Sequence, residues 1–245
     1  MSMTSTTHLE TLVETLRPRF QAVHERIEAA ARAHGREAAA ITLIAVGKTK
    51  PVALLRAAAE LGQRHFGENY SQELVDKRTA LAAAPIRPPV QWHFIGPIQS
   101  NKTTLLAEAC DWLHSLDRDK IAARLNAARD RRSPLPVLIQ VNLDAEASKA
   151  GVAPYAVRAF AERLRQYSAL QLRGLMAIPA PRVEPGKQRQ AFARLRQLAE
   201  GLAREGHTMD TLSMGMSADL EAAIAEGATH VRIGSALFGA RTPRG

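Results

Sequence analysis

One lysine in the sequence stands where its amine could act as a nucleophile. Lys48 follows the apolar run 41–47 and should point to the same face of the strand as the alternate residues Ile44 and Val46. Gly47 leaves space beside the backbone for a bulky ligand. Partial removal from water favours the neutral amine, which is the form that attacks an aldehyde to give a Schiff base. The structural alternative is a lysine that extends its charged end into water. Lys50 is a nearby competitor, although Pro51 takes it out of the strand pattern.

A second group of candidate residues lies near the C-terminus, where the chain could bind an anion. Ser217 precedes a helix-forming stretch, 218–225, and is predicted to be its N-cap, while Gly234 and Ser235 open a further helix. The first N–H groups of a helix have no partner within it and attract anions such as phosphate. Ordinary helix capping explains the same residues without a ligand. Asp219 would complement the helix dipole but repel a phosphate, so we expect it to point outward.

Arg232 is the third candidate, because it lies inside an apolar run, 230–233, two residues before Gly234. A buried guanidinium is unfavourable unless its charge is paired. We therefore expect Arg232 to face a ligand ring or a carboxylate. An ion pair between neighbouring strands is the structural alternative.

The elements that must position these residues alternate between short β-like runs and helical patterns. They predict a single (β/α)8 barrel of the TIM type with an extra N-terminal helix, and an open doubly wound sheet is the alternative because two of the runs are short. We assign residues 1–35 to an N-terminal helical segment that packs on the barrel, and residues 36–245 to the barrel itself. The predicted strands are 41–47, 64–66, 90–95, 112–116, 137–143, 170–178, 211–214 and 230–233. The predicted helices are 8–34, 52–61, 71–83, 120–131, 154–167, 187–204 and 218–225.

The barrel prediction can be tested within the sequence, because such barrels place their chemistry at the carboxyl ends of the strands. Polar and glycine-rich clusters should then follow the apolar runs rather than precede them. They do so at Lys48, 67–69, 96–102, Asn142, Pro179, 215–217 and 234–235.

The composition narrows the class of protein. The chain has 245 residues, of which 46% are hydrophobic, and its one cysteine, Cys110, cannot form an intrachain disulfide, so a cytoplasmic location is expected. The N-terminus has no continuous apolar segment of the secretory kind, and no apolar run is long enough to span a bilayer. The net charge is +9, but basic residues are interleaved with acidic ones and lack accompanying aromatic residues. We therefore expect neither a nucleic-acid nor a membrane partner, and the histidines lack the spacing of metal ligands.

Six segments form long motifs: IAVGKTKP at 44–51, FGENY at 66–70, WHFIGPIQSNK at 92–102, GLMAIP at 174–179, LSMGMSAD at 212–219 and VRIGSALFG at 231–239. In sequence and in order, these motifs closely resemble the pyridoxal phosphate homeostasis protein family. The resemblance extends from about Glu10 to Arg241. One small departure is visible, because Gly47 stands where the family often has serine.

The resemblance implies a barrel like the N-terminal domain of alanine racemases, without the β-rich second domain of those enzymes. By that likeness the cofactor is pyridoxal 5'-phosphate (PLP), Lys48 bears it as a Schiff base, and Arg232 faces the pyridine nitrogen. An arginine there keeps the nitrogen unprotonated, so the ring is a poor electron sink for carbanions. The other implied cofactor-binding residues are Asn69 and Met216 beside the cofactor, and Ser217, Gly234 and Ser235 at its phosphate.

The same resemblance implies a role in intracellular PLP homeostasis, as a carrier or buffer that passes PLP to PLP-dependent apo-enzymes. Racemisation needs a second acid/base group, which the racemases take from a tyrosine of their second domain. Tyr70 is the single candidate for a substitute. Because one candidate does not replace the missing domain, we predict no catalytic residue and no robust activity. The alternative is a PLP-dependent amino-acid racemase or lyase of narrow scope. Because the family is often monomeric, we expect a monomer; acceptor enzymes and regulatory ligands cannot be named from the sequence.

Overall fold

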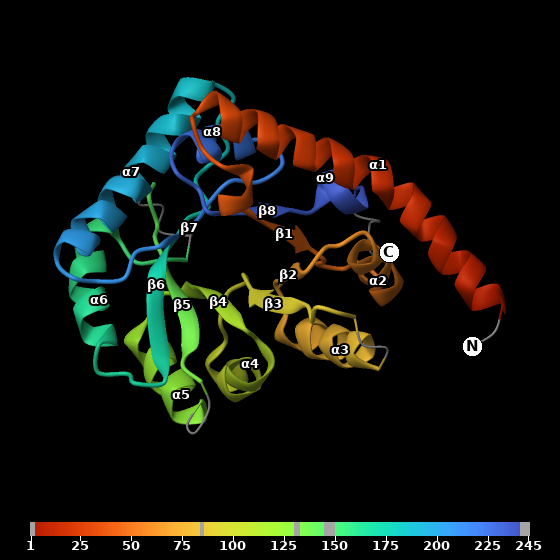
Figure 1. Ribbon diagram of the computed structural model, residues 1–245. Helices are drawn as coiled ribbons and strands as arrows, with labels where there is room; N and C mark the ends of the chain where they lie inside the picture. The colour runs from red at the N-terminus through yellow and green to blue at the C-terminus, as the bar shows by residue number, and fades with distance from the viewer. Residues whose placement is uncertain (1–2, 84–85, 130–132, 145–149, 241–245) are drawn as a thin grey trace.

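The eight predicted strands close into a parallel barrel in the computed structural model (Figure 1). The structure describes residues 3–83, 86–129, 133–144 and 150–240. The strands pair in chain order, and β8 returns to β1 with Ile233 opposite Ala45. The predicted (β/α)8 barrel is therefore confirmed, and the open sheet is wrong. The strands are β1 Thr42–Val46, β2 His65–Glu68, β3 Gln91–Phe94, β4 Trp112–Leu116, β5 Leu135–Gln140, β6 Leu170–Met176, β7 Thr211–Ser213 and β8 His230–Ile233.

Helices surround the strands, and the long helix α1 lies across the outside of α8 and α9 (Figure 1). The predicted helices are present with shifted ends, except that the predicted end of the fourth, residues 130–131, lies outside the described residues. The short helix α4 was not predicted, because seven residues carry too little periodicity. The α-helices are α1 Met3–Ala33, α2 Val52–Glu60, α3 Ser71–Ala82, α4 Thr103–Ala109, α5 Asp119–Ala128, α6 Val157–Leu164, α7 Pro185–Arg204, α8 Leu220–Ala225 and α9 Ser235–Phe238. Short 3-10 helices occupy Ala38–Ala40 (η1), Ser100–Lys102 (η2) and Pro154–Ala156 (η3).

Odd and even positions of the strands both carry apolar residues, because both faces of the sheet are covered. Successive side chains of a strand point to opposite faces. On β1, Ile44 shares the interior face with Arg232 of β8, whereas Ala45 points toward the helices, and all three residues are buried. Burial on both sides explains the near-continuous apolar runs.

Helix α1 covers the seam where the barrel closes. A stripe of buried residues, Leu16, Phe20, Val23 and Ile27, packs the helix against α2, α8 and α9. Arg26 adds an ion pair to Glu221 of α8, with Nε 2.7 Å from Oε1. Within the described ranges, no helix combines the length and the apolarity that crossing a membrane requires.

The loop between β7 and α8 corrects two expectations. Helix α8 begins at Leu220, and its N-cap residue is Asp219, so the prediction that Ser217 is the N-cap was wrong. The Asp219 carboxylate accepts a hydrogen bond from the Met216 N–H, with Oδ1 2.6 Å from N, and the Asp219 N–H donates to Met216 O. This turn occupies residues 216–219, which prevents the helix from starting earlier. The carboxylate therefore folds back onto the loop rather than pointing outward.

Four histidines from different strands fill the amino-terminal part of the barrel interior. His93 lies at the centre, with its ring centroid 5.2 Å from that of His65, 5.1 Å from that of His114 and 6.0 Å from that of His230. Trp112 stacks on His93 at 6.0 Å. Burial lowers the pKa of His93 and His114 well below the ordinary value and that of His230 to about 4. The barrel interior therefore holds these imidazoles in their neutral form.

We expect the free energy of unfolding to decrease as the pH falls from about 6.5 to about 4. A group whose pKa is depressed in the folded state contributes stability above its unfolded pKa, and loses that contribution as the pH falls. In this range the unfolded chain protonates His93, His114 and His230, whereas the native barrel does not. Each residue then contributes a slope of up to about 1.4 kcal/mol per pH unit, measurable by urea denaturation.

The substitution His230→Gln should reduce this slope by up to about 1.4 kcal/mol per pH unit, the contribution of one proton, because it removes one buried titrating ring. The matched control is His34→Gln, which removes an exposed histidine. Equal slopes for His230→Gln and the unsubstituted protein would contradict the interpretation.

Candidate functional site

A pocket of about 340 Å³ opens at the carboxyl ends of the strands, where the sequence predicted the chemistry. All seven predicted cofactor-binding residues line it: Lys48, Asn69, Met216, Ser217, Arg232, Gly234 and Ser235. The sequence analysis did not place six further residues of its wall: Val46, Lys50, Ile95, Ile178, Ala218 and Gly239. The pocket thus combines residues from the first strands and the last strands of the chain.

The amine of Lys48 lies at the mouth of this pocket. The side chain is half-buried, and its Nζ lies 5.0 Å from the centroid of the Tyr70 ring. A cation at this distance is attracted by the face of an aromatic ring. The next residue, Thr49, has a φ of 63°, a left-handed conformation that is uncommon for a residue with a side chain. The chain therefore turns sharply just after Lys48.

A buried ionic network holds the backbone on both sides of Lys48. Lys77 of α3 donates to Gly47 O at 2.8 Å, to Glu68 Oε1 at 2.8 Å and to Glu73 Oε2 at 3.0 Å. Glu73 Oε2 also accepts the Thr49 N–H at 2.9 Å. One ammonium group thus fixes the carbonyl before Lys48, and its carboxylate partner fixes the amide after it.

Glu68 is the least solvated member of this network. Burial raises its pKa to about 7 against the opposing effect of the Lys77 charge. Its Oε2 has no hydrogen-bond partner among the described residues. A Cβ at Gly47 would lie 2.5 Å from Glu68 Oε1, so the glycine provides the space for this carboxylate. The glycine at position 47, where the family often has serine, is therefore explained by the close approach of Glu68.

Lys50 also lines the pocket, but its amine is bound to the backbone. Its Nζ donates to Gly239 O at 3.1 Å and to Ala240 O at 2.8 Å. Two hydrogens of the amine are therefore engaged by backbone carbonyls. The geometry therefore favours Lys48 over Lys50 as the nucleophile.

The loops after β7 and β8 form the opposite wall. Ser217 Oγ and Ser235 Oγ lie 3.4 Å apart, so the two hydroxyls face one point. Ser235 begins helix α9, whose first N–H groups have no acceptor within the helix. Arg26 of α1 donates to Ser217 O at 3.0 Å and fixes this loop from outside the barrel. Two hydroxyls and nearby backbone donors suit a phosphate.

Arg232 lies deeper, at the base of the pocket. Its Nη1 donates to Ser213 Oγ at 2.6 Å and its Nη2 to Ala177 O at 2.9 Å. Two neutral acceptors thus hold the guanidinium, rather than the ion pair between strands that was the structural alternative, and the nearby Asp219 supplies the opposing charge. Burial lowers the pKa of Arg232 to about 10, so the group stays cationic at neutral pH. Its remaining N–H groups are available to a ligand in the pocket.

These groups fit a small aromatic aldehyde that carries a phosphate. The pocket volume lies within the range usual for small-ligand sites, about 300–1,000 Å³. Lys48 supplies an amine on one wall, while Ser217 and Ser235 supply hydrogen-bond donors on the other. Arg232 and Lys50 add positive charge, which favours a dianion.

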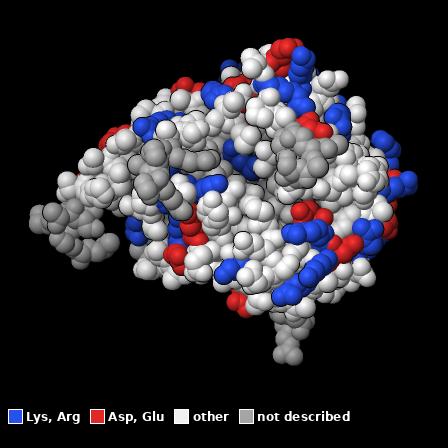
Figure 2. All heavy atoms as spheres, turned by 180° about the vertical axis from the view of Figure 1, so that it is seen from behind, with Lys and Arg blue, Asp and Glu red and all other residues white. Residues whose placement is uncertain are grey.

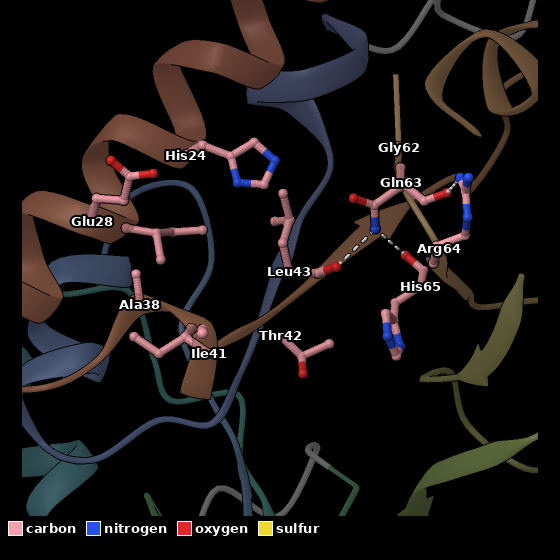
Figure 3. A pocket seen from close by; sticks show the side chains of 12 residues that line it. His24, Glu28, Ala38, Ile41, Thr42, Leu43, Gly62, Gln63, Arg64 and His65 are labelled. Atoms are coloured by element: carbon pink, nitrogen blue, oxygen red, sulfur yellow. Dashed lines mark hydrogen bonds between the residues drawn. The ribbon is translucent and has the colours of Figure 1, made fainter. Parts of the chain in front are cut away.

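A second and larger hollow, about 410 Å³, lies at the amino ends of β1 and β2 beneath α1 (Figure 3). His24 and Glu28 of α1 face Gln63 and the start of β2 across it. No lysine lines it among the described residues, and the Arg64 guanidinium donates to the backbone carbonyls of Ala59, Gln63 and Arg87. This hollow therefore lacks the nucleophile that the first pocket contains.

Some of the charged surface groups form ion pairs. Exposed pairs include Arg17 with Glu14 at 2.8 Å and Arg196 with Glu200 at 2.7 Å. Over the face in Figure 2, basic and acidic side chains are interspersed, and the described basic residues there form no continuous stripe. Within the described ranges, no three His, Cys, Asp or Glu residues converge as metal ligands would.

Comparison with known proteins finds relatives over nearly the whole chain. The profile described as "Alanine racemase, N-terminal domain" matches residues 19–242. A "Pyridoxal phosphate homeostasis protein" of Pseudomonas aeruginosa is 54% identical over 230 residues, which cover 94% of this chain and 97% of that protein. The protein of the same name from Escherichia coli is 48% identical over 220 residues, covering 89% and 94%.

Solved structures extend the comparison. PipY of Synechococcus elongatus, whose structure is described as having PLP bound, is 35% identical with a TM-score of 0.76, covering 87% of this chain and 100% of that one. An alanine racemase of Clostridium difficile is 13% identical with a TM-score of 0.70. It matches 94% of this chain but only 58% of its own length, and this distant likeness shows the fold alone.

The substitution Lys77→Met should decrease the free energy of unfolding by about 3–5 kcal/mol above neutral pH, because it leaves Glu68 buried without its partner. The loss should be smaller at pH 5, where Glu68 becomes protonated and carries no charge. Urea denaturation at the two pH values measures both effects.

The matched control is Lys187→Met. Lys187 Nζ also lies 2.8 Å from a carboxylate oxygen, that of Glu184, but both side chains are more than 60% exposed. Its loss should change stability by no more than about 1 kcal/mol. Equal effects of the two substitutions would contradict the role assigned to burial.

Proposed function

Because the chain belongs to the pyridoxal phosphate homeostasis protein family and contains the alanine racemase N-terminal domain, we propose that it carries or buffers PLP attached covalently at Lys48. One observation carries this proposal. Lys48, from the start of the barrel, shares one pocket with Arg232 and the two serine-containing loops from its end. Relatives named for PLP homeostasis, and a PLP-bound neighbour of 35% identity, support the choice of cofactor.

Each lining residue has a role set by its chemistry. Lys48 would hold the cofactor through its aldehyde carbon, with release of water, and the hydroxyls of Ser217 and Ser235 would donate to its phosphate beside the backbone of Gly234. Arg232 donates toward the ring nitrogen, while Asn69 and Met216 line the sides of the cofactor.

The character of Arg232 argues against strong catalysis. Bound PLP supplies an electron sink for carbanions, and that sink is strongest when its ring nitrogen is protonated. With its pKa near 10, Arg232 keeps its proton at neutral pH and acts as a hydrogen-bond donor rather than an acid. The ring nitrogen therefore stays unprotonated, which suits storage of the cofactor better than turnover.

A racemase or lyase of narrow scope is the second candidate, and Tyr70 is the observation that favours it. The Tyr70 ring lies 5.0 Å from Lys48 Nζ, and the side chain is 47% exposed. A phenol beside the amine could act as the second acid/base group that racemisation needs. Its exposure leaves it poorly oriented for that task, so we rank this function below the carrier.

We place the protein in the cytoplasm, with PLP-dependent apo-enzymes as transient partners and a monomer as the working form. Its one cysteine, Cys110, is buried and free, and burial raises the pKa of its thiol to about 12. Such a thiol is inert, which suits a protein without redox chemistry.

The substitution Lys48→Ala should abolish borohydride-trapped attachment of PLP, since Lys50, the other lysine among the described residues of the pocket, donates to two backbone carbonyls. Reduction followed by peptide mapping should locate the label on Lys48 in the unsubstituted protein and in Lys50→Ala. Loss of the label from Lys50→Ala, or its persistence in Lys48→Ala, would overturn the assignment.

Incubation of the loaded protein with amino acids should leave their circular dichroism unchanged over hours. By contrast, mixing it with a PLP-dependent apo-enzyme should restore that enzyme's activity. If chirality is lost at a rate that falls in Tyr70→Phe, the racemase is supported and the carrier is refuted as the sole function.

A further inference from the structure

A hydrogen-bonded chain of polar side chains runs from Arg232 through the barrel interior toward its amino end. Arg232 Nη1 lies 2.6 Å from Ser213 Oγ, which lies 2.8 Å from His114 Nδ1. His114 Nε2 lies 2.9 Å from His93 Nδ1, and His93 Nε2 lies 3.0 Å from His65 Nδ1. The links join β8, β7, β4, β3 and β2, so the chain crosses the inside of the barrel.

Arginine gives this chain a direction. A guanidinium carries donors and no acceptor, so Ser213 Oγ accepts from Arg232. The serine proton then has one acceptor among the described residues, His114 Nδ1, and a fully buried hydroxyl proton without an acceptor is unfavourable. His114 must therefore carry its own proton on Nε2. The same reasoning places the protons of His93 and His65 on Nε2.

We propose that Ser213, His114, His93 and His65 form a one-directional chain that orients Arg232 toward the cofactor ring. This inference rests on the proposed function, in which Arg232 donates to the ring nitrogen. The four side chains are positioning residues, because the cofactor pocket is lined by Arg232 and by none of them.

Burial keeps the chain in this single arrangement. Ser213, His93 and His114 have no exposed surface, and the pKa values of both histidines are lowered well below the ordinary value. An added proton on either ring would place two N–H donors face to face. Reversal of all the bonds is blocked, since Arg232 cannot accept. The chain therefore has one low-energy pattern of protons.

The far end of the chain is solvated. His65 is half-buried and lines the hollow at the amino ends of β1 and β2 (Figure 3). Its Nε2–H, the last donor of the chain, lies at this hollow, where water can reach it. Each donor from Arg232 Nη1 to His93 Nε2 thus has an acceptor in the chain, and the nearby Asp219 carboxylate supplies the charge that opposes the buried cation.

The tautomers of the cofactor-free protein provide the first test. Long-range nitrogen–proton NMR correlations should show His65, His93 and His114 with the proton on Nε2 at neutral pH. A proton on Nδ1 of His114, or a mixture of tautomers, overturns the proposal. This measurement involves neither PLP nor any substitution.

The substitution Ser213→Ala provides the second test. It removes the acceptor of Arg232 Nη1 and the donor to His114 Nδ1, so His114 should become a mixture of tautomers. Affinity for PLP, measured by titration of its visible absorbance, should decrease by about tenfold, with the label still on Lys48. Unchanged affinity or an unchanged tautomer overturns the positioning role.

Ser115→Ala is the matched control. Ser115 is as buried as Ser213 and donates to Gly96 O, but it lies outside the chain. It should leave the tautomer of His114 unchanged and alter PLP affinity by less than about twofold. Equal losses of affinity in the two variants would show a general effect of core damage and overturn the proposal.

The two proposals fail in different ways. If borohydride trapping finds no label on Lys48, the proposed function fails while the tautomer result stands. If labelling is normal but the tautomers differ from Nε2–H, the chain fails and the PLP site stands. Should Ser213→Ala not fold, the tautomers of the unsubstituted protein still decide the matter.

Discussion

The hydrogen-bonded pairing of β1 with β8 is the interaction on which the site depends. Neighbouring strands lie about 4.8 Å apart, so their carboxyl ends deliver Lys48 and Gly234 to the same small volume although they come from opposite ends of the chain. Such closure must overcome the entropy of joining distant segments. Helix α1 packs over this seam through Phe20 and neighbouring apolar residues, and Arg26 reaches from it to the carbonyl of Ser217. The extra helix thus supports the closure and one wall of the pocket together.

Two buried cations, Lys77 and Arg232, then fix the positions of groups in the closed barrel. Lys77 holds the backbone before Lys48, and Arg232 is held by Ser213 and the carbonyl of Ala177. Taking such charges out of water is unfavourable, and their partners at best compensate for it. Their effect is on orientation, because each cation satisfies all of its hydrogen-bond acceptors in one arrangement only. The protein therefore devotes part of its stability to the orientation of two groups.

Apolar runs followed by polar clusters report local structure directly, so the pattern was sufficient for the strands, the barrel and five pocket residues, whereas Asn69 and Met216 were implied only by the family resemblance. The sequence did not reveal the roles of Glu68 and Lys77. Glu73 and Lys77 do have the i,i+4 spacing of neighbours on a helix. Their importance comes from burial against Gly47, which depends on how α3 packs. The histidines were judged only as metal ligands, and nothing in their spacing reveals that His93 bridges two others. The start of α8 was misplaced because an Asp219 turn competes with the helix, and propensity alone does not decide that contest.

If Lys48 holds PLP as proposed, its partial exposure affects how readily the cofactor is exchanged. A bond between an amine and an aldehyde forms with loss of water and is broken by its addition, so a site that water reaches remains reversible. Enzymes that use such a bond for turnover gain from excluding water. Here the amine is half-buried, and Met216 at the pocket wall is 36% exposed. Occupancy of the proposed site would then follow the surrounding aldehyde concentration in either direction, as the reservoir of a buffer must.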